Sequence, residues 1–218
     1  GQWSEDRPGA SLLPDGSCQA VLPGLGRIEL FPAQLTMPGE HNRRNLMAAG
    51  LAAWAAGADP QRLGKALAEF PGVEHRLEVF LKRNDVRWVN DSAATVPEAV
   101  AAALGSFTGH ISLITGGTDK NLDYKPLRSA YKRANTIVLL AGSGTDKLIP
   151  ILKEDGIGYL GPCSSIEEAI ALAAQHSPPG ATIMLSPGAT SFGMFKNEFD
   201  RGLRFKAAVR SYYGTAPY

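Results

Sequence analysis

Residues 111–120 read ISLITGGTDK, an apolar run that ends in two glycines, a carboxylate and a lysine. The apolar part, Ile111 to Thr115, is typical of a short buried strand, and the polar part of a tight turn before a helix. Two later segments, Thr136 to Ala141 and Thr182 to Leu185, repeat this pattern. Short apolar strands that alternate with amphipathic helices predict an α/β fold, with a mostly parallel sheet covered on both faces.

The segments around these strands predict further elements. Leu77–Leu81 and Val86–Asn90 flank Arg83-Asn84-Asp85, which is a hairpin signal. Two capping boxes, Thr95–Glu98 and Ser164–Glu167, predict helices that run to about Leu104 and His176. Other helices are expected over residues 127–133, 146–154 and 197–212, and a short strand over residues 158–160.

The first 70 residues have a different pattern. Cys18–Leu22 and Arg27–Phe31 flank a Pro- and Gly-rich turn and predict a hairpin, which we expect to be the edge of a sheet whose other strands lie elsewhere. Helices are expected over residues 41–56 and 59–70, before the break at Pro71-Gly72. We therefore expect two domains, residues 1–71 and residues 72–218.

The composition excludes several classes of protein. Of 218 residues, 44% are apolar and 20% charged, which is typical of a globular protein, and the net charge of +1 gives no field that favours nucleic acid. No apolar run is long enough to cross a membrane. The two cysteines, Cys18 and Cys163, lack zinc-site spacing, so we expect free thiols in a reducing cytoplasm and no metal site. No G-x-x-x-x-G-K-S/T phosphate loop occurs.

Chemistry is expected where the strands end, because ligands of open α/β sheets bind beyond the carboxyl ends of the strands. Lys120 lies just beyond Gly116-Gly117 and suits a carboxylate or phosphate, unless it is a solvated lysine on a tight turn. The loop from Ser186 to Ser191 offers an anion site or only a helix cap. Gly142–Gly144 does not fit a dinucleotide fingerprint and is read as a structural turn.

Two charged residues near the first strand end allow two readings each. Asp91 follows the strand Val86–Asn90 and is either a cap or turn residue or a partner for a ribose hydroxyl. Arg76 stands between Glu74 and Glu78 in the sequence, where a surface ion pair is the simpler reading.

Five segments in order resemble the motifs of Mur ligases, which are ATP-dependent amide ligases. They are residues 39–45 (GEHNRRN), 72–78 (GVEHRLE), 90–95 (NDSAAT), 116–120 (GGTDK) and 185–202 (LSPGATSFGMFKNEFDRG). The last segment, together with the others, points to the D-glutamate-adding branch. The resemblance implies a Rossmann-like C-terminal domain for residues 72–218, preceded by a partial segment of the central ATPase domain.

The resemblance also implies roles for individual positions. Asn42 and Asn45 match positions near the adenine of ATP, and Arg76 and Asp91 match positions that meet the nucleotide from the C-terminal domain. The positions that match those holding D-glutamate are Thr95, Lys120, Ser191 and Phe192. The other substrate implied is UDP-N-acetylmuramoyl-L-alanine, the reaction passes through an acyl phosphate, and a monomer is expected.

The sequence departs from the family pattern at three positions of these motifs: Ala93 stands where lysine is usual, Val96 where asparagine is usual and Gly193 where aspartate is usual. The resemblance further implies that the phosphate loop, the Mg²⁺ ligands and a carbamylated lysine precede residue 1, so we expect no turnover by this polypeptide alone. The alternatives are another Mur or folylpolyglutamate-type ligase, and a non-catalytic module that binds small anions or a partner.

Overall fold

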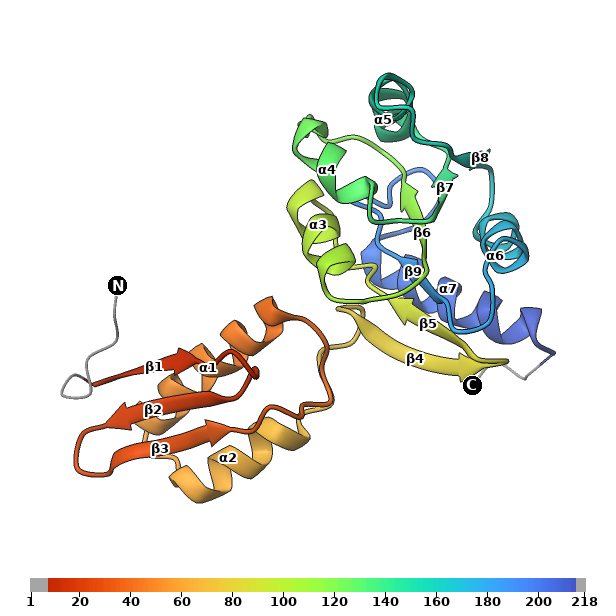
Figure 1. Cartoon of the computed structure of the whole chain (residues 1–218). Coiled ribbons are helices and arrows are strands. Elements are labelled where there is room, and N and C mark those ends of the chain that lie inside the picture. Colours follow the sequence, from red (N-terminus) through yellow and green to blue (C-terminus); the bar gives the residue numbers. More distant parts are fainter. Residues whose placement is uncertain (1–7, 215–218) are drawn as a thin grey trace. The chain divides into compact units, whose positions relative to one another are not determined.

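The computed structural model describes residues 8–214, and the chain forms two compact units, Gly1–Gly72 and Val73–Tyr218 (Figure 1). The parts of the expected domains that fall on residues 1–7 and 215–218 lie outside the described residues. The boundary between the units adjoins Pro71, and Gly72 has a φ of 100°, in the region that glycine favours.

Unit 1 holds a three-stranded antiparallel sheet, β1 (Gly9–Leu12), β2 (Cys18–Leu22) and β3 (Gly26–Phe31). The predicted hairpin is confirmed as β2 and β3. The expectation that the hairpin's other partner lies elsewhere is wrong, because β1 pairs with β2 from Gly9 opposite Val21 to Leu12 opposite Cys18. Strand β1 is four residues long and half-buried throughout, so it lacks the apolar alternation that marks a strand in a sequence.

Two helices accompany this sheet, α1 (Glu40–Ala55) and α2 (Pro60–Glu69), close to the predicted bounds. The carboxylate of Asp59 caps α2 by accepting from the backbone N–H groups of Gln61 and Arg62, at 2.9 and 3.1 Å. The core between sheet and helices is formed by apolar side chains of both, including Leu30, Phe31, Leu46, Leu63 and Leu67.

Unit 2 is built on a six-stranded sheet with the order β4-β5-β9-β6-β7-β8. Its strands are β4 (Glu78–Arg83), β5 (Val86–Asn90), β6 (Ile111–Gly116), β7 (Thr136–Leu140), β8 (Leu160–Cys163) and β9 (Thr182–Leu185). All neighbours are parallel except β4, which joins β5 through the predicted hairpin. Asn84 and Asp85 form the turn with φ of 51° and 59°, as a type I′ hairpin requires.

Helices cover both faces of this sheet (Figure 1). They are α3 (Pro97–Gly105), η1 (Lys125–Leu127), α4 (Arg128–Tyr131), α5 (Ser143–Glu154), α6 (Ile166–Gln175) and α7 (Glu198–Tyr212). Side chains of α3, α4 and α5 share one core with Leu113, and those of α6 and α7 share a second core with Ile114. Adjacent residues of β6 thus face opposite layers, which confirms the predicted parallel sheet buried on both sides.

Several predicted helix starts are corrected. Helix α3 starts at Pro97 with Val96 as its N-cap and no side-chain cap, so the proposed box at Thr95 does not form. The second box exists one residue later than predicted: Ser165 accepts from the N–H of Glu168 at 3.1 Å, and the Glu168 carboxylate accepts from the N–H of Ser164 at 2.9 Å. Helix α5 starts at Ser143 rather than at Asp146.

Both cysteines are free and buried, as expected. Among the helices of residues 8–214, none has the length and apolar content that a membrane span requires.

Candidate functional site

The carboxyl ends of four strands lie side by side at one edge of the unit 2 sheet. Strands β5, β9, β6 and β7 are consecutive neighbours and all parallel, with Asn90 opposite Leu185, Ile114 opposite Leu185 and Gly116 opposite Leu140. The chain leaves this edge through the loops that begin at Asp91, Gly117, Ala141 and Ser186. This arrangement confirms that the four polar strand ends meet at one edge.

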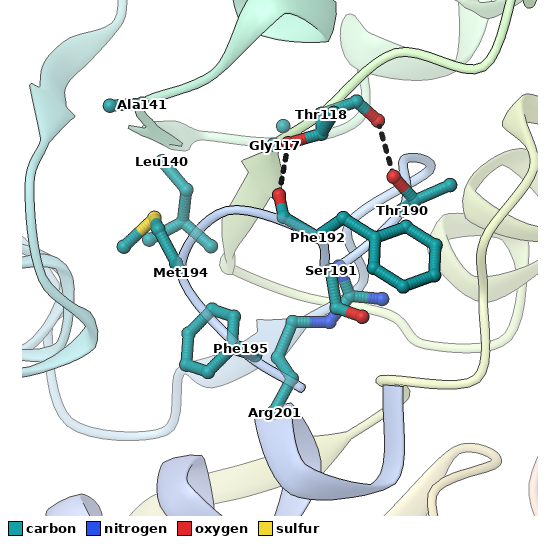
Figure 2. Close-up of a pocket in the computed structure, with 11 residues that line it drawn as sticks. Gly117, Thr118, Leu140, Ala141, Thr190, Ser191, Phe192, Met194, Phe195 and Arg201 are labelled. Carbon is teal, nitrogen blue, oxygen red and sulfur yellow. Dashed lines mark hydrogen bonds between the residues drawn. The ribbon is translucent and has the colours of Figure 1, made fainter. Parts of the chain in front are cut away.

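Two of these loops are joined directly. Thr118 and Thr190 form an isolated antiparallel bridge, with the Thr190 hydroxyl donating to the Thr118 carbonyl at 3.0 Å. The Thr118 hydroxyl donates to the carbonyl of Phe192 (Figure 2). Gly117 permits this approach, because a Cβ there would lie 2.9 Å from the Thr190 carbonyl oxygen. The loop after β6, which carries Lys120, and the loop after β9, which carries Ser191, are therefore linked to each other.

A small pocket opens at this junction (Figure 2). Its lining consists of Gly116, Gly117, Thr118, Leu140, Ala141, Thr190, Ser191, Phe192, Met194, Phe195 and Arg201. Ser191 is buried, yet its hydroxyl has no hydrogen-bond partner in the described part of the chain, so it is available to a ligand.

Of the other three residues matched to D-glutamate positions, Phe192 lines this pocket, whereas Lys120 and Thr95 are not part of its lining. Phe192 lines it with its side chain 64% exposed. Lys120 is exposed at the end of the Gly116–Lys120 loop and pairs with no acidic side chain of residues 8–214. Thr95 is half-buried, and its neighbour Ala94 accepts from the Gly188 N–H at 2.9 Å, which ties the loop after β5 to the loop after β9.

Asp91 is a buried carboxylate, and each of its two oxygens accepts one hydrogen bond. Its Oδ1 accepts from the Leu77 N–H at 3.1 Å and its Oδ2 accepts from the Ser186 hydroxyl at 2.7 Å. Burial raises the pKa of Asp91 to about 6, although the bonds from Ser186 and Leu77 and the charge of Arg76 oppose the rise. Asp91 therefore fixes the segment before β4 to the loop after β9, at the edge where a nucleotide is expected.

Asp91→Asn is expected to stabilise the chain at pH 7.5. A carboxyl whose pKa is 3.8 when unfolded and about 6 when folded contributes stability below pH 3.8 that is lost as the pH rises through 6. Asparagine can accept from the Leu77 N–H with its Oδ1 and donate from its Nδ2 to Ser186 Oγ, without the buried charge, so we expect a gain of about 2–3 kcal/mol. Urea unfolding at pH 4.5 and 7.5 measures this: the difference between variant and parent should grow with pH. Equal pH profiles would contradict it, and the exposed Asp146→Asn is the control.

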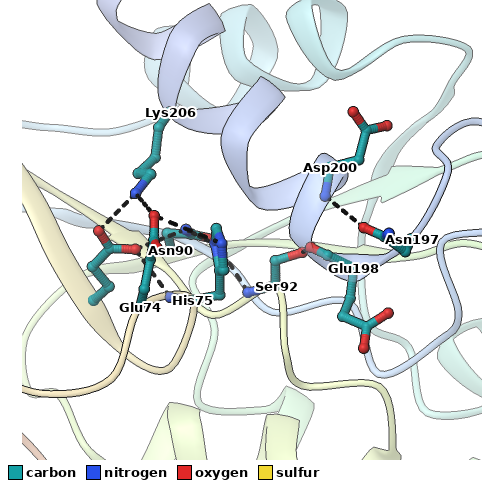
Figure 3. Close-up of polar contacts among 9 residues, drawn as sticks. Glu74, His75, Asn90, Ser92, Asn197, Glu198, Asp200 and Lys206 are labelled. Atoms are coloured by element: carbon teal, nitrogen blue, oxygen red, sulfur yellow. Dashed lines mark hydrogen bonds and ion pairs between the residues drawn. The ribbon is translucent and has the colours of Figure 1, made fainter. Parts of the chain in front are cut away.

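Arg76 does not form the expected ion pair with Glu74 or Glu78. Lys206 from α7 takes that place, donating to Glu74 Oε1 at 2.7 Å and Glu78 Oε1 at 2.9 Å (Figure 3). The side chain of Arg76 is exposed, and its charge is felt by Asp91. Because both carboxylates already form ion pairs with Lys206, the Arg76 guanidinium remains available for an anionic ligand.

Glu74, His75 and Glu78 form the one group of possible metal ligands within range in the described residues. The ammonium of Lys206 bonds to both carboxylates, and His75 Nδ1 accepts from Asn90 at 2.8 Å (Figure 3). Burial lowers the pKa of His75. This cluster is thus satisfied by protein groups and does not fit a Mg²⁺ ion, which prefers oxygen ligands and retained waters.

Arg201 is a residue of this site whose role the sequence did not predict. It is 1% exposed and donates to Ser92 Oγ at 2.9 Å, to the Ser92 carbonyl at 2.8 Å and to the Ala189 carbonyl at 3.1 Å. It therefore holds the loops after β5 and β9 together beneath the pocket. Arg201 and Gly202 end the last of the five motifs, which is the one sign of a role. Nothing in the local sequence indicates that the Arg201 side chain is buried.

The turn Gly142–Gly144 is structural, as predicted, although Ser143 and Gly144 belong to α5. The N–H groups of Gly144 and Thr145 donate to the Gly117 carbonyl at 2.8 and 3.3 Å. A helix N-terminus whose donors are already engaged is not open to an anion.

Asn42 and Asn45 lie on α1 in unit 1. Asn42 is buried and its Nδ2 donates to the Pro38 carbonyl at 2.8 Å, whereas Asn45 is exposed. Of these two side chains, only that of Asn45 is therefore exposed to solvent.

Known proteins resemble this chain in both fold and sequence. MurC from Thermotoga maritima, a UDP-N-acetylmuramate–alanine ligase, superposes with a TM-score of 0.66 at 20% identity, over 95% of this chain and 45% of that one. Escherichia coli FolC in complex with ADP superposes with a TM-score of 0.62 at 16% identity, over 93% and 46%. No family model matches the chain. At these identities the structures show a shared fold, and together with sequence relatives at 44–48% identity they show that the chain belongs to the Mur ligase family.

The sequence relatives specify the branch of that family. The chain is 48% identical over 151 residues to the UDP-N-acetylmuramoylalanine–D-glutamate ligase of Treponema pallidum, covering 69% of this chain and 28% of the relative. It is 44% identical over 177 residues to the ligase of the same name from Roseiflexus, covering 80% and 38%. The chain thus spans less than half the length of these relatives.

Proposed function

We propose that this chain supplies the amino-acid side of the active site in a ligase that joins D-glutamate to UDP-N-acetylmuramoyl-L-alanine, an ATP-dependent step of peptidoglycan precursor synthesis in the cytoplasm. The observation that carries the proposal is 44–48% identity to ligases of that name, over most of the chain. The link between the loops that bear Lys120 and Ser191 supports it, since a cation on one loop and a free hydroxyl on the other suit a dicarboxylate amino acid.

The reaction has two steps. The carboxylate of the alanyl substrate attacks the γ-phosphate of ATP, which forms an acyl phosphate and releases ADP. The amine of D-glutamate then attacks the acyl carbon, loses a proton and expels inorganic phosphate. Lys120, Ser191, Thr95 and Phe192 would hold D-glutamate so that its amine faces the acyl carbon, which is catalysis by positioning.

Each unit, taken by itself, carries residues that match nucleotide positions. Asp91 would accept from a ribose hydroxyl, Arg76 would face a phosphate, and Asn42 and Asn45 would lie near the adenine. The ADP bound to the FolC neighbour is consistent with ATP use, and Mg²⁺ would supply charge neutralisation at the phosphates. Lys206 engages the carboxylates of Glu74 and Glu78, so these residues are not proposed as ligands of the metal.

Binding without turnover is the expected behaviour of this 218-residue chain. Titration with D-glutamate, followed by ¹H–¹⁵N NMR, should shift the amides of Lys120 and Ser191, while L-glutamate should shift them much less. With ATP, Mg²⁺ and all substrates present, no phosphate should be released, because the sequence has no phosphate-binding loop. Equal shifts with both enantiomers would contradict the proposed substrate, and steady phosphate release would contradict the inactivity.

A further inference from the structure

The first turn of α5 is packed against the loop that carries Lys120. The N–H groups of Gly144 and Thr145 donate to the Gly117 carbonyl at 2.8 and 3.3 Å, and the Gly117 N–H donates to Thr145 Oγ1 at 3.0 Å. The Thr145 hydroxyl in turn donates to the Leu140 carbonyl, at the end of β7. Thr145 is fully buried, so these bonds form without competition from water.

A second set of contacts reaches the residue next to Lys120. The Asp119 N–H donates to Ser143 Oγ at 3.1 Å, and Lys147, one turn further along α5, forms an ion pair with the Asp119 carboxylate. The other carboxylate oxygen of Asp119 accepts from the Leu122 N–H at 3.1 Å. The backbone on both sides of Lys120 is therefore held, while the Lys120 side chain is exposed.

The glycines of the α5 turn make this packing possible. A Cβ at Gly144 would lie 2.9 Å from the Gly117 carbonyl oxygen and 2.7 Å from the Tyr124 hydroxyl. A Cβ at Gly142 would lie 3.0 Å from Gly117 Cα and closer still to its carbonyl. The turn formed by residues 142–147 (GSGTDK) therefore packs closely against the loop that carries Lys120. This packing requires glycine at positions 142 and 144, although neither glycine is proposed to bind a ligand.

We propose that Thr145 and Lys147 are positioning residues for Lys120, and that through it they set the affinity for the carboxylate of the amino-acid substrate. This inference rests on the proposed function. A lysine has a flexible four-carbon side chain, so its ammonium can be placed only as well as its backbone is placed. Neither Thr145 nor Lys147 has to touch the substrate for this effect.

The test measures the dissociation constant of D-glutamate by NMR titration of the 218-residue chain and its variants. Lys147→Met should weaken binding about threefold to fivefold, the factor expected for a half-exposed ion pair, and Lys147→Arg should restore it. Thr145→Val should weaken binding about tenfold by leaving the Gly117 N–H unpaired, and Thr145→Ser should restore it. Lys153→Met, exposed on the last turn of the same helix, should bind like the parent.

Two further measurements distinguish the possible outcomes: the thermal midpoint of each variant, and D-glutamate binding by Lys120→Ala. Lys147→Met should keep the thermal midpoint of the parent, so that weaker binding does not reflect unfolding, and it carries the test alone if Thr145→Val does not fold. If Lys120→Ala weakens binding but Lys147→Met and Thr145→Val do not, the positioning inference is wrong and the proposed function stands. If Lys120→Ala also binds like the parent, the proposed amino-acid site itself is wrong. Weaker binding by Lys153→Met would overturn the inference too.

Discussion

Gly202→Ala is expected to destabilise unit 2 by about 2–4 kcal/mol. A Cβ on this residue of α7 would lie 2.8 Å from His75 Cε1, closer still to His75 Nδ1, and 3.1 Å from Asn90 Nδ2. His75 has little freedom to move away, because it is 3% exposed, has a φ of 64° and accepts from Asn90. The added methyl group must therefore displace α7 or break the hydrogen-bond network.

The control for this variant is Gly105→Ala on α3. A Cβ there would meet nothing within 4 Å and Gly105 lies in a helix, so we expect no loss and a gain of up to about 1 kcal/mol. Urea unfolding of the parent and both variants measures the difference. A Gly202→Ala variant as stable as the parent would show that His75 and α7 are not packed as described.

The network around Gly202 also bears on the site. The His75 carbonyl accepts from the Ala93 N–H at 3.0 Å, and the Ser92 N–H donates to Asn90 Oδ1 at 3.2 Å. Both bonds act on the loop that follows Asp91. We therefore infer that the motif glycine at position 202 acts by letting α7 approach this loop and that it contacts no ligand.

Local sequence patterns were sufficient to predict the central strands of unit 2. Strands β6, β7 and β9 are apolar runs bounded by glycine or polar residues, and a run buried on both faces has few other structures open to it. The hairpin at Asn84-Asp85 was predictable for the same reason, since its turn residues tolerate positive φ. Errors occurred where the pattern was short or ambiguous: at β1, at the first residues of α3 and α5, and at β8, which was expected over residues 158–160 and spans Leu160–Cys163.

The interactions within the site could not be predicted, because they are non-local. Thr118 and Thr190 are 72 residues apart in the sequence, and Arg201 reaches Ser92 across 109 residues. Sequence proximity favoured an ion pair between Arg76 and Glu74 or Glu78. Instead, α7 places the Lys206 ammonium between these two carboxylates, and it pairs with both. The sequence shows which residues at the strand ends are polar. Which of these residues contact one another depends on the order of the strands in the sheet.

Lys120 is the residue on which the proposed substrate depends most. A carboxylate ligand that pairs with a lysine gains a charge-assisted bond, which is worth about 1.5–3 kcal/mol. Ala93, where the family usually has lysine, removes one alternative cation from the same edge. We therefore expect Lys120→Ala to weaken D-glutamate binding by a factor of about 10 to 100, while Lys132→Ala, exposed at the end of α4, leaves it unchanged.

The most direct test is a calorimetric titration of D-glutamate into the parent chain, Lys120→Ala and Lys132→Ala under the same conditions. The account predicts that the parent and Lys132→Ala bind alike and that Lys120→Ala binds at least tenfold more weakly. Equal affinity of Lys120→Ala and the parent would contradict the assignment of these strand ends to D-glutamate, as would the absence of any binding by the parent.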